Sequence, residues 1–349
     1  MSFDSIPVVD IADLGSPDPA AHAAVIRRLR DAAEQVGFLY VTGHGIPGET
    51  IAGVRQAALD FFALPAARKM EVYIGHSRNH RGYVPEGEEV SAGGTPDAKE
   101  AFDLSIDLPA DDPDYLSGNP LLGPNQWPRD LPGFGENVAA YYEATFAVGH
   151  RLLRGFSEAL GLPPDHLSQF VTKPPSQLRL IHYPYNAAAS DRPGMGAHTD
   201  YEVFTLLLPT ASGLEVMNGL GEWIDAPLMP GAFVINIGDM LEVWSNGTFA
   251  ATSHRVRRVT QERYSFPLFF ACDYGTSVEP LAPFVSQERP AAYPPIQAGE
   301  HLFAQTAQTF QYLKRRIASG EISLPEQSVA LSSFGQAARH TPSSSSRPT

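Results

Sequence analysis

Two side chains that can bind a metal ion lie two residues apart in the segment 196–201. They are His198 and Asp200, and on a β-strand this spacing places both side chains on the same face. The run 203–208 that follows is apolar and partly β-branched, which favours a strand in this region. One imidazole and one carboxylate directed at the same point would supply two ligands of a metal site.

A third ligand is available at His254, which follows Asp200 by 54 residues. Two histidines and one carboxylate bound to one side of an iron ion leave the other coordination positions open for O2 and a substrate. A His-x-Asp pair alone is common by chance, so this interpretation depends on the residues around it.

A possible anion clamp follows the third ligand. Arg263 and Ser265 are two residues apart and would share one face of a strand. An unbroken strand would place His254 and Arg263 on opposite faces, so we expect the polar residues 260–262 to form a turn and the two strands to form a hairpin. A buried guanidinium needs an anion, and its planar shape suits a carboxylate, to which Ser265 can add a hydroxyl group.

This combination resembles the iron(II)/2-oxoglutarate oxygenases of the isopenicillin N synthase-like family. The similarity extends over nearly the whole chain and includes the segments 6–10, 37–46, 82–93, 196–201 and 238–247. Segments 82–93 and 196–201 are most similar to the ethylene-forming-enzyme-like branch. The resemblance implies that the catalytic metal Fe(II) is held by His198, Asp200 and His254, that 2-oxoglutarate is bound by Arg263 and Ser265, and that O2 is consumed.

Further contacts are implied by the same resemblance. In the family, the tyrosine that matches Tyr183 often hydrogen-bonds 2-oxoglutarate, although this chain has Ile181 where many plant members carry asparagine. In the ethylene-forming branch, the position of Glu89 holds the cationic end of an arginine, and the position of Ser91 carries a hydroxyl residue in the same pocket. An acidic residue in a Gly-rich loop is also commonly a surface residue, and both interpretations of Glu89 stay open.

The segment 178–184 is expected to be a strand of the core sheet. Alternation would direct Arg179 and Tyr183 to one face and His182 to the other. In the ethylene-forming branch the residue matching His182 is an arginine that binds the substrate carboxylate. A protonated histidine could do the same, and a histidine of the protein core is the alternative. Tyr201, at the end of the shared segment 196–201, is a further candidate for substrate contact.

The expected elements predict one catalytic domain over residues 1–324. Its fold class is α+β and β-rich, with a double-stranded β-helix, or jelly roll, flanked by helices. We expect helical N-terminal support over 1–175, a jelly-roll core over about 176–275 and a C-terminal helix over about 296–318. Residues 240–244 and 249–256 are expected to pair as strands, and 325–349 to form a partly disordered tail.

Composition limits the partners and the location. The 349 residues include 25 Lys and Arg against 39 Asp and Glu, a net charge of −14, which disfavours nucleic acid and anionic membranes. No apolar run approaches the ~20 residues of a membrane span. The first residues lack the features of a signal peptide, and the single Cys272 excludes an intramolecular disulfide. We expect a cytoplasmic monomer or weak homodimer with a small-molecule substrate.

The predicted function is the oxidation of a C–H bond of an amino acid or derivative, with succinate and CO2 as co-products. Glu89 suggests a basic amino acid, and the outcome is hydroxylation, desaturation or cyclisation. One alternative is an oxidase of the isopenicillin N synthase type, in which Arg263 binds the substrate carboxylate and 2-oxoglutarate is not used. Others are ethylene formation from 2-oxoglutarate and, in a different class, a cupin-like protein with a non-redox metal that consumes no O2.

Overall fold

Two β-sheets form the centre of the computed structural model, which describes residues 2–90, 97–185, 194–257 and 261–324. The larger sheet has eight strands, most of them antiparallel to their neighbours. In spatial order they are β1 (Val8–Asp10), β2 (Phe38–Thr42), β10 (Phe233–Ile237), β7 (Phe204–Pro209), β12 (Arg263–Phe270), β5 (Gln177–Tyr183), β4 (Glu100–Leu104) and β3 (Gly82–Val84).

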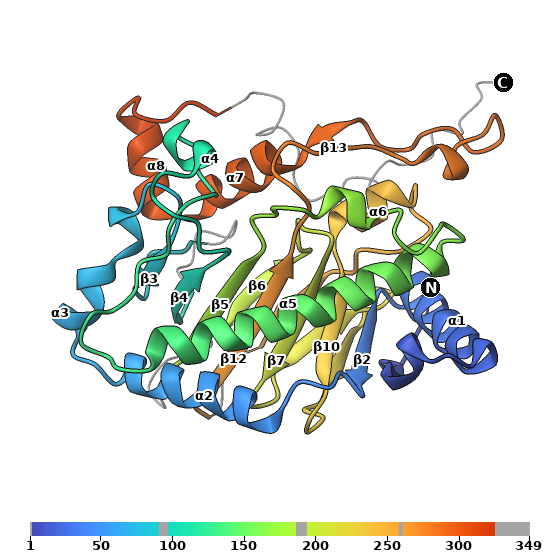
Figure 1. Ribbon diagram of the computed structural model, residues 1–349, viewed down its shortest axis with the longest axis horizontal. Coiled ribbons are helices and arrows are strands. Elements are labelled where there is room, and N and C mark those ends of the chain that lie inside the picture. Colours follow the sequence, from blue (N-terminus) through green and yellow to red (C-terminus); the bar gives the residue numbers. More distant parts are fainter. Residues whose placement is uncertain (1, 91–96, 186–193, 258–260, 325–349) are drawn as a thin grey trace, which may run out of the picture.

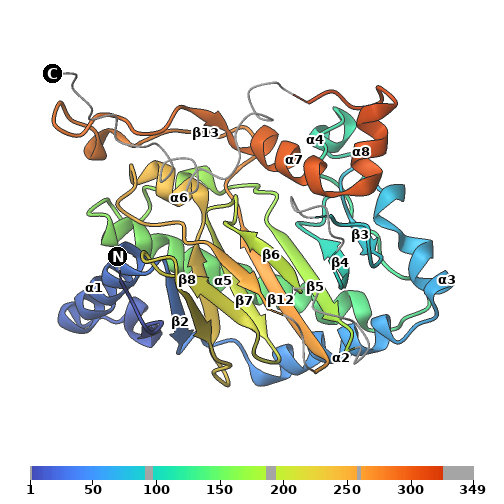
Figure 2. The ribbon, with the colours of Figure 1, turned by 180° about the vertical axis from the view of Figure 1, so that it is seen from behind.

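The smaller sheet lies against one face of the larger sheet (Figure 2). Its strands, in spatial order, are β6 (Met195–His198), β11 (His254–Val256), β8 (Leu214–Met217) and β9 (Trp223–Ala226). Side chains of both sheets share one apolar cluster, in which Ile181 and Tyr183 from the larger sheet pack with Val256 from the smaller one. Two antiparallel sheets packed face to face form the jelly roll that the sequence predicts.

Three long helices cover the other face of the larger sheet. They are α1 (Pro19–Gln35), α2 (Gly48–Phe62) and α5 (Phe134–Ala159), and Figure 1 shows α5 crossing β10, β7 and β12. Asp18 caps α1 by accepting a hydrogen bond from the Ala20 amide. Gly37 ends this helix with φ +73°, and a Cβ atom there would lie 2.1 Å from the Ala250 carbonyl oxygen, so only glycine fits.

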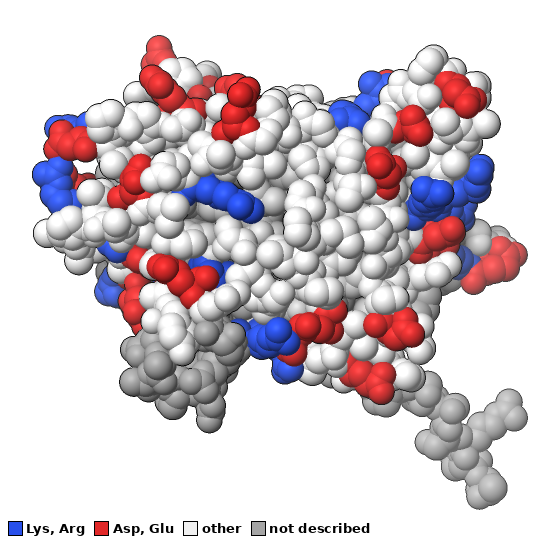
Figure 3. Space-filling model, turned by 90° about the horizontal axis from the view of Figure 1, so that it is seen from below, with Lys and Arg blue, Asp and Glu red and all other residues white. Residues whose placement is uncertain are grey.

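The remaining α-helices and strands are short, apart from the C-terminal pair of helices. They are α3 (Ala66–Lys69), α4 (Pro113–Leu116), α6 (Asp239–Trp244), β13 (Ser277–Val278), β14 (Ile296–Gln297), α7 (Ala298–Thr309) and α8 (Gln311–Ala318). In the described ranges, none of the helices is both long enough and apolar enough to cross a membrane. The face seen from below in Figure 3 carries acidic and basic side chains interspersed, without a broad basic area.

Residues 240–244 do not form the expected strand. The structure has the helix α6 over Asp239–Trp244, and all six of its residues are buried. A short apolar segment that is buried on every side shows no alternation, so periodicity cannot separate a helix from a strand there.

The expected hairpin between His254 and Arg263 is also wrong. Strand β11, which carries His254, pairs with β6 and β8, whereas β12, which carries Arg263, pairs with β5 and β7. The two strands therefore belong to different sheets, and the odd spacing of the two residues places no restriction on their faces. Arg263 extends toward the smaller sheet, since its Nε atom lies 4.0 Å from where a Cβ atom of Gly213 would be.

The expected C-terminal helix is divided at Phe310. This residue has extended backbone angles, φ −85° and ψ 126°, and separates α7 from α8. Its backbone pairs with Glu89, and two flanking hydrogen bonds join Val90 to Thr309 and Gln311 to Glu88. The break thus fixes the segment around Glu89 against the C-terminal helices.

Candidate active site

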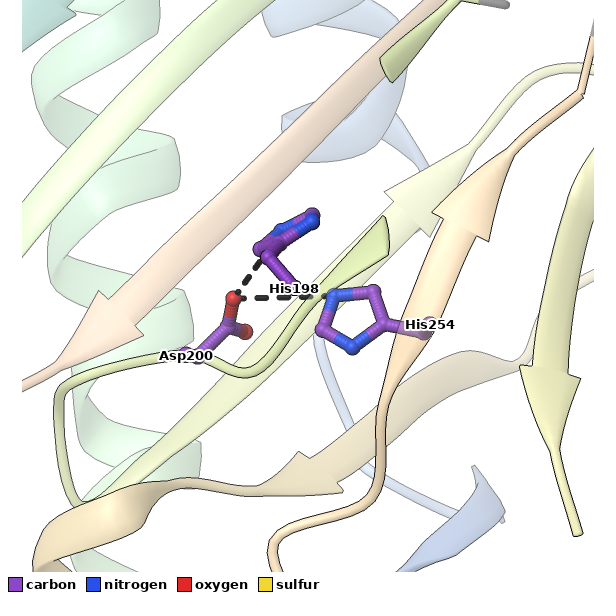
Figure 4. A group of neighbouring side chains, drawn as sticks. All are labelled: His198, Asp200 and His254. Atoms are coloured by element: carbon purple, nitrogen blue, oxygen red, sulfur yellow. Dashed lines mark ion pairs between the residues drawn. The ribbon is translucent and has the colours of Figure 1, made fainter. Parts of the chain in front are cut away.

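Three possible metal ligands come together where the two sheets face each other (Figure 4). His198 is the last residue of β6, Asp200 lies in the loop that follows, and His254 begins β11 directly opposite His198. The Nε2 atoms of both imidazoles lie 3.5 Å from Oδ1 of Asp200. One ligand atom from each residue lies within 4.8 Å of the others, close enough for one ion to bind all three.

Backbone carbonyls orient both imidazoles. Nδ1 of His198 lies 2.8 Å from the Gly196 oxygen, and Nδ1 of His254 lies 3.3 Å from the Thr252 oxygen. A carbonyl oxygen only accepts hydrogen bonds, so the proton of each neutral ring belongs on Nδ1. The lone pair of each Nε2 then faces Asp200, which is the arrangement that metal-binding histidines use.

Two neutral donors fix the carboxylate of Asp200. The Thr205 hydroxyl on β7 and the Asn236 amide on β10, at 2.6 Å, both donate to its Oδ2 atom and leave Oδ1 facing the imidazoles. Burial would raise the pKa of Asp200, but His254, His198 and the Thr205 hydroxyl hold it well below its usual range. Thr205 and Asn236 were not among the predicted site residues, although each is a lone polar residue in an apolar strand.

The donor set fits a ferrous ion. Burial, with a smaller contribution from the neighbouring His198, lowers the pKa of His254 to about 4, whereas the Asp200 carboxylate outweighs burial at His198 and raises its pKa. A neutral imidazole is the form that binds metal, and two imidazoles with one carboxylate are the ligands of non-haem iron oxygenases. The residues present are therefore suited to the metal that the sequence predicts.

Arg263 is a buried cation without an acidic partner in the described ranges. It is 1% exposed, and its Nη1 and Nε atoms donate to Ser265 Oγ and the Ala211 oxygen, each at 3.3 Å. Its guanidinium carbon lies 4.8 Å from the centre of the Tyr183 ring. Burial lowers the pKa of Arg263, because a charge removed from water is costly without a counter-ion. The surroundings of Arg263 therefore favour the binding of an anion.

The carboxylate of Glu89 is buried and already paired. Its Oε1 accepts from Nη1 of Arg179 at 2.9 Å and its Oε2 from Nη2 at 3.0 Å. The Lys99 ammonium lies 3.1 Å from Oε2. Ser91, the other residue predicted for this subsite, lies outside the described residues. Glu89 is therefore not a surface residue, and its internal partners Arg179 and Lys99 are not indicated by the sequence around it.

The ion cluster of Glu89 extends along the metal-facing side of β5. Nε of Arg179 donates to Asp103 Oδ1 at 2.8 Å, and Lys99 also lies 3.0 Å from Asp97. Arg179 shares its strand face with Tyr183, four residues away, which corresponds to about 13 Å along the strand. The cluster therefore lies on the same face of β5 as Tyr183, whose ring lies beside the Arg263 guanidinium.

His182 lies on the opposite face of β5, as alternation predicts. Its two ring nitrogens are each 2.9 Å from a glutamate oxygen, of Glu100 and Glu262, and its ring stacks on Tyr264 with centroids 4.6 Å apart. The ring also lies near Phe62 of α2. This geometry favours the core-histidine alternative, because the side chain faces the helical layer rather than the metal ligands.

Tyr201 directly follows Asp200 and is half-buried. Its ring meets the edge of His301 on α7, with centroids 5.9 Å apart, and burial raises its pKa. The structure thus groups the predicted residues into the metal triad, the Arg263 clamp with Ser265 and Tyr183, the paired Glu89, and Tyr201 beside α7.

Two family models match the chain. One, described as non-haem dioxygenase in morphine synthesis N-terminal, matches residues 6–130. The other, described as the 2OG-Fe(II) oxygenase superfamily, matches residues 174–271 and so spans the metal triad and the clamp.

Similar proteins and structures cover almost the whole chain. A homoarginine-6-hydroxylase of Arabidopsis thaliana is 35% identical, over 88% of this chain and 98% of the relative. A 2-oxoglutarate-Fe(II) type oxidoreductase of Emericella nidulans is 32% identical, over 83% and 86%. A full-length Neurospora crassa protein, solved in complex with alpha-KG and thymine, has a TM-score of 0.74 and 26% identity, over 90% of this chain and 97% of that one.

Proposed function

The chain belongs to the 2OG-Fe(II) oxygenase family, whose members use Fe(II), 2-oxoglutarate and O2, and from this premise we propose that it oxidises a C–H bond of an amino acid or amino-acid derivative. Hydroxylation is the outcome that the names of the curated relatives support. Desaturation and cyclisation are the alternatives. Mass spectrometry separates the outcomes, because only hydroxylation adds one oxygen atom to the substrate.

Each group of residues has a role in this proposal. Iron held by His198, Asp200 and His254 would activate O2 while 2-oxoglutarate is converted to succinate and CO2. Arg263 would bind the far carboxylate of 2-oxoglutarate with its planar fork, and Ser265 would donate its hydroxyl to the same group. The Tyr183 ring lies beside the guanidinium of Arg263, with 4.8 Å between the ring centre and the guanidinium carbon.

The observation that carries the proposal is the buried Arg263, which has no acidic partner in the described ranges and extends from the larger sheet toward the smaller sheet that carries His198 and His254. An oxidase that uses this arginine for its substrate remains the second candidate, as does ethylene formation from 2-oxoglutarate. The test is the ratio of succinate formed to O2 consumed during turnover. A ratio near one supports the coupled oxygenase, whereas O2 consumption without succinate supports the oxidase, and ethylene in the headspace supports the third candidate.

A basic amino acid is the narrower candidate for the substrate. It is supported by the homoarginine hydroxylases among the relatives and by the buried carboxylate of Glu89. In this chain, however, a cationic substrate would have to share Glu89 with Arg179 and Lys99. Glu89→Gln tests the idea: unchanged turnover of every cationic substrate would contradict it.

We further propose a monomer or weak homodimer in the cytoplasm. The net charge of −14 supports a protein that does not associate with nucleic acid or anionic membranes. Sedimentation velocity over a range of concentrations tests the association state, and fractionation of cells tests the location.

A further inference from the structure

His182 lies directly behind the proposed 2-oxoglutarate clamp, on the outer face of the larger sheet. Strands β5 and β12 pair so that His182 is opposite Tyr264, and the two rings stack with their planes 12° apart. Nε2 of the same imidazole lies 2.9 Å from Oε1 of Glu262. Glu262 and Tyr264 are the chain neighbours of Arg263, which points to the inner face. One side chain therefore holds the chain on both sides of Arg263.

The second ring nitrogen of His182 faces a buried carboxylate. Nδ1 lies 2.9 Å from Oε1 of Glu100 on β4. The other oxygen of Glu100 accepts from Nζ of Lys69 and from the Tyr83 hydroxyl, both at 2.6 Å. Burial acts to raise the pKa of Glu100, but these three hydrogen bonds hold it below its usual value. Glu100 is therefore an ionised acceptor in a fixed position.

Two carboxylates on one imidazole require two protons on the ring. An ionised carboxylate only accepts hydrogen bonds, and a neutral imidazole carries a single N–H. In a neutral ring the proton would belong on Nδ1, because Glu100 is buried and fixed, whereas the side chain of Glu262 is 59% exposed. The lone pair of Nε2 would then face the Glu262 carboxylate, which can turn into water. The contact between His182 and Glu262 thus depends on the second proton.

The groups around the ring balance an imidazolium. Phe62 of α2 packs near the ring, with centroids 5.3 Å apart. The titratable groups that face the ring directly or through Glu100 are Glu100 on β4, Glu262 and Tyr264 on β12, Lys69 on α3 and Tyr83 on β3. Lys69 and an imidazolium supply two positive charges against the two carboxylates. Loss of the ring proton would leave one negative charge of this group without its partner.

We propose that His182, as an imidazolium, is a positioning residue for the 2-oxoglutarate clamp. It ties Glu262 and Tyr264 to β4 through Glu100, and so fixes the segment from which Arg263 reaches the co-substrate. Loss of the second proton releases Glu262, and the start of β12 loses one of its anchors. The affinity for 2-oxoglutarate therefore falls as the pH rises. This inference rests on the proposed role of Arg263 in binding 2-oxoglutarate.

The test measures 2-oxoglutarate affinity by calorimetry with the anaerobic Fe(II) protein, from about pH 6 to about pH 9, a range in which histidine side chains lose their charge. At each pH the affinity is divided by that of His182→Gln, so that titration of the metal ligands cancels. The ratio of wild type to His182→Gln should be about threefold or more at low pH and should fall toward one at high pH.

His182→Arg is the conservative variant. It keeps a planar cation that can stack on Tyr264 and donate to both carboxylates at every pH. Its affinity relative to His182→Gln should therefore stay at the low-pH value of wild type over the whole range. A residue that only filled space behind the sheet would not give this combination of a pH-dependent wild type and a pH-independent rescue.

Glu262→Gln tests the other partner at an exposed position, where a substitution leaves the buried core intact. The amide accepts from an imidazolium and donates to a neutral ring, so the pH response of wild type should be lost. His22→Gln is the matched control. His22 also contacts a glutamate, Glu158, at 2.8 Å, and a backbone carbonyl, but on the helices α1 and α5. This control should keep the affinity and the pH response of wild type.

The protonation of the ring is measured separately, by NMR of the zinc-loaded protein with 15N-labelled histidine. The signals that disappear in His182→Gln belong to His182. Two of its nitrogens should carry protons at about pH 6, and the Nε2 proton should be lost as the pH rises. A single protonated nitrogen at about pH 6 would overturn the inference, as would a wild-type pH response shared by His182→Gln and Glu262→Gln.

Arg263→Ala in the same titrations separates failure of the inference from failure of the proposed function. If this variant binds 2-oxoglutarate as tightly as wild type, the clamp itself fails, and the inference fails with it. If Arg263→Ala loses 2-oxoglutarate while His182→Gln and Glu262→Gln keep the affinity and pH response of wild type, only the inference about His182 fails. The expected result is loss of binding in Arg263→Ala and loss of the pH response in the other two variants.

Discussion

Two buried arginines on neighbouring strands have opposite surroundings. Arg263 on β12 and Arg179 on β5 point to the same side of the larger sheet and are 1% and 7% exposed. Arg179 binds two carboxylates, of Glu89 and Asp103. Arg263 donates to a hydroxyl and a backbone carbonyl, and in the described ranges has no acidic partner.

The difference indicates which of the two cations serves a ligand. A buried charge is costly unless it is paired. Arg179 is paired within the protein with Glu89 and Asp103, so its charge is already compensated. Arg263 lacks such a pair, and its charge is best satisfied by an anion from outside, which in this family is 2-oxoglutarate.

The largest expected difference between the two arginines is in the free energy of unfolding. Arg179→Ala leaves Glu89 and Asp103 buried without their shared cation, and should lower the free energy of unfolding by about 3–5 kcal/mol. Arg263→Ala removes a cation that lacks an acidic partner, and should change it by less than about 1 kcal/mol. Urea unfolding in the absence of 2-oxoglutarate measures both. Equal losses in the two variants would show that the surroundings of the two arginines do not differ energetically.

The second prediction concerns the anion. Arg263→Ala should weaken 2-oxoglutarate binding by about 2–5 kcal/mol, or roughly 30-fold and more, because the carboxylate loses a buried charged partner. Arg263→Lys keeps the charge without the planar fork and should recover only part of this loss. Calorimetric titration of the Fe(II) protein measures the affinities. A larger effect from Arg179→Leu than from Arg263→Ala would reverse the assignment of the two arginines.

The third prediction concerns the metal-binding carboxylate of Asp200 and the two donors that orient it. Asp200 is held by the neutral donors Thr205 and Asn236, and not by a guanidinium. Asn236→Ala should therefore lower metal affinity by about 10–100-fold, since it frees the carboxylate to rotate. Metal competition titrations measure the change, with Asn218→Ala in the β8–β9 turn as the control. Unchanged affinity would show that Asn236 does not orient the ligand.

The smallest effect is a pH dependence from Asp103. Burial raises its pKa from the usual 3.8 to about 6, and its Oδ2 atom has no hydrogen-bond partner in the described ranges. Between these two pH values the folded protein holds a proton that the unfolded chain has lost, so the free energy of unfolding contributed by Asp103 falls as pH rises. Relative to Asp103→Asn, wild type should lose stability from pH 4 to pH 6. A rise over this window would contradict the raised pKa.

Local spacing predicted much of the site. The two-residue spacing of Arg263 with Ser265 describes neighbours on one strand, and alternation on β5 correctly separated Tyr183 from His182. The expected strand did not extend to Asp200, which lies in the loop after β6. Such periodicity acts within one element, so it is available from the sequence alone.

The partners across the sheets could not be predicted in the same way. Arg179 and Glu89 are 90 residues apart, and nothing in either segment specifies the other. The assumed hairpin of His254 and Arg263 failed because the chain passes from one sheet to the other between them. The helix break at Phe310 coincides with its pairing with Glu89, which is also a long-range contact.

The central claim is that iron at the triad and the cation of Arg263 together bind 2-oxoglutarate. The most direct measurement is an anaerobic spectral titration of the Fe(II)-loaded protein with 2-oxoglutarate, for wild type and Arg263→Ala. We predict a visible charge-transfer band from chelation of the ketoacid by iron, which saturates in wild type and is lost in Arg263→Ala at the same concentrations. Iron binding without any band in wild type would contradict the claim and favour the oxidase, in which Arg263 holds the substrate.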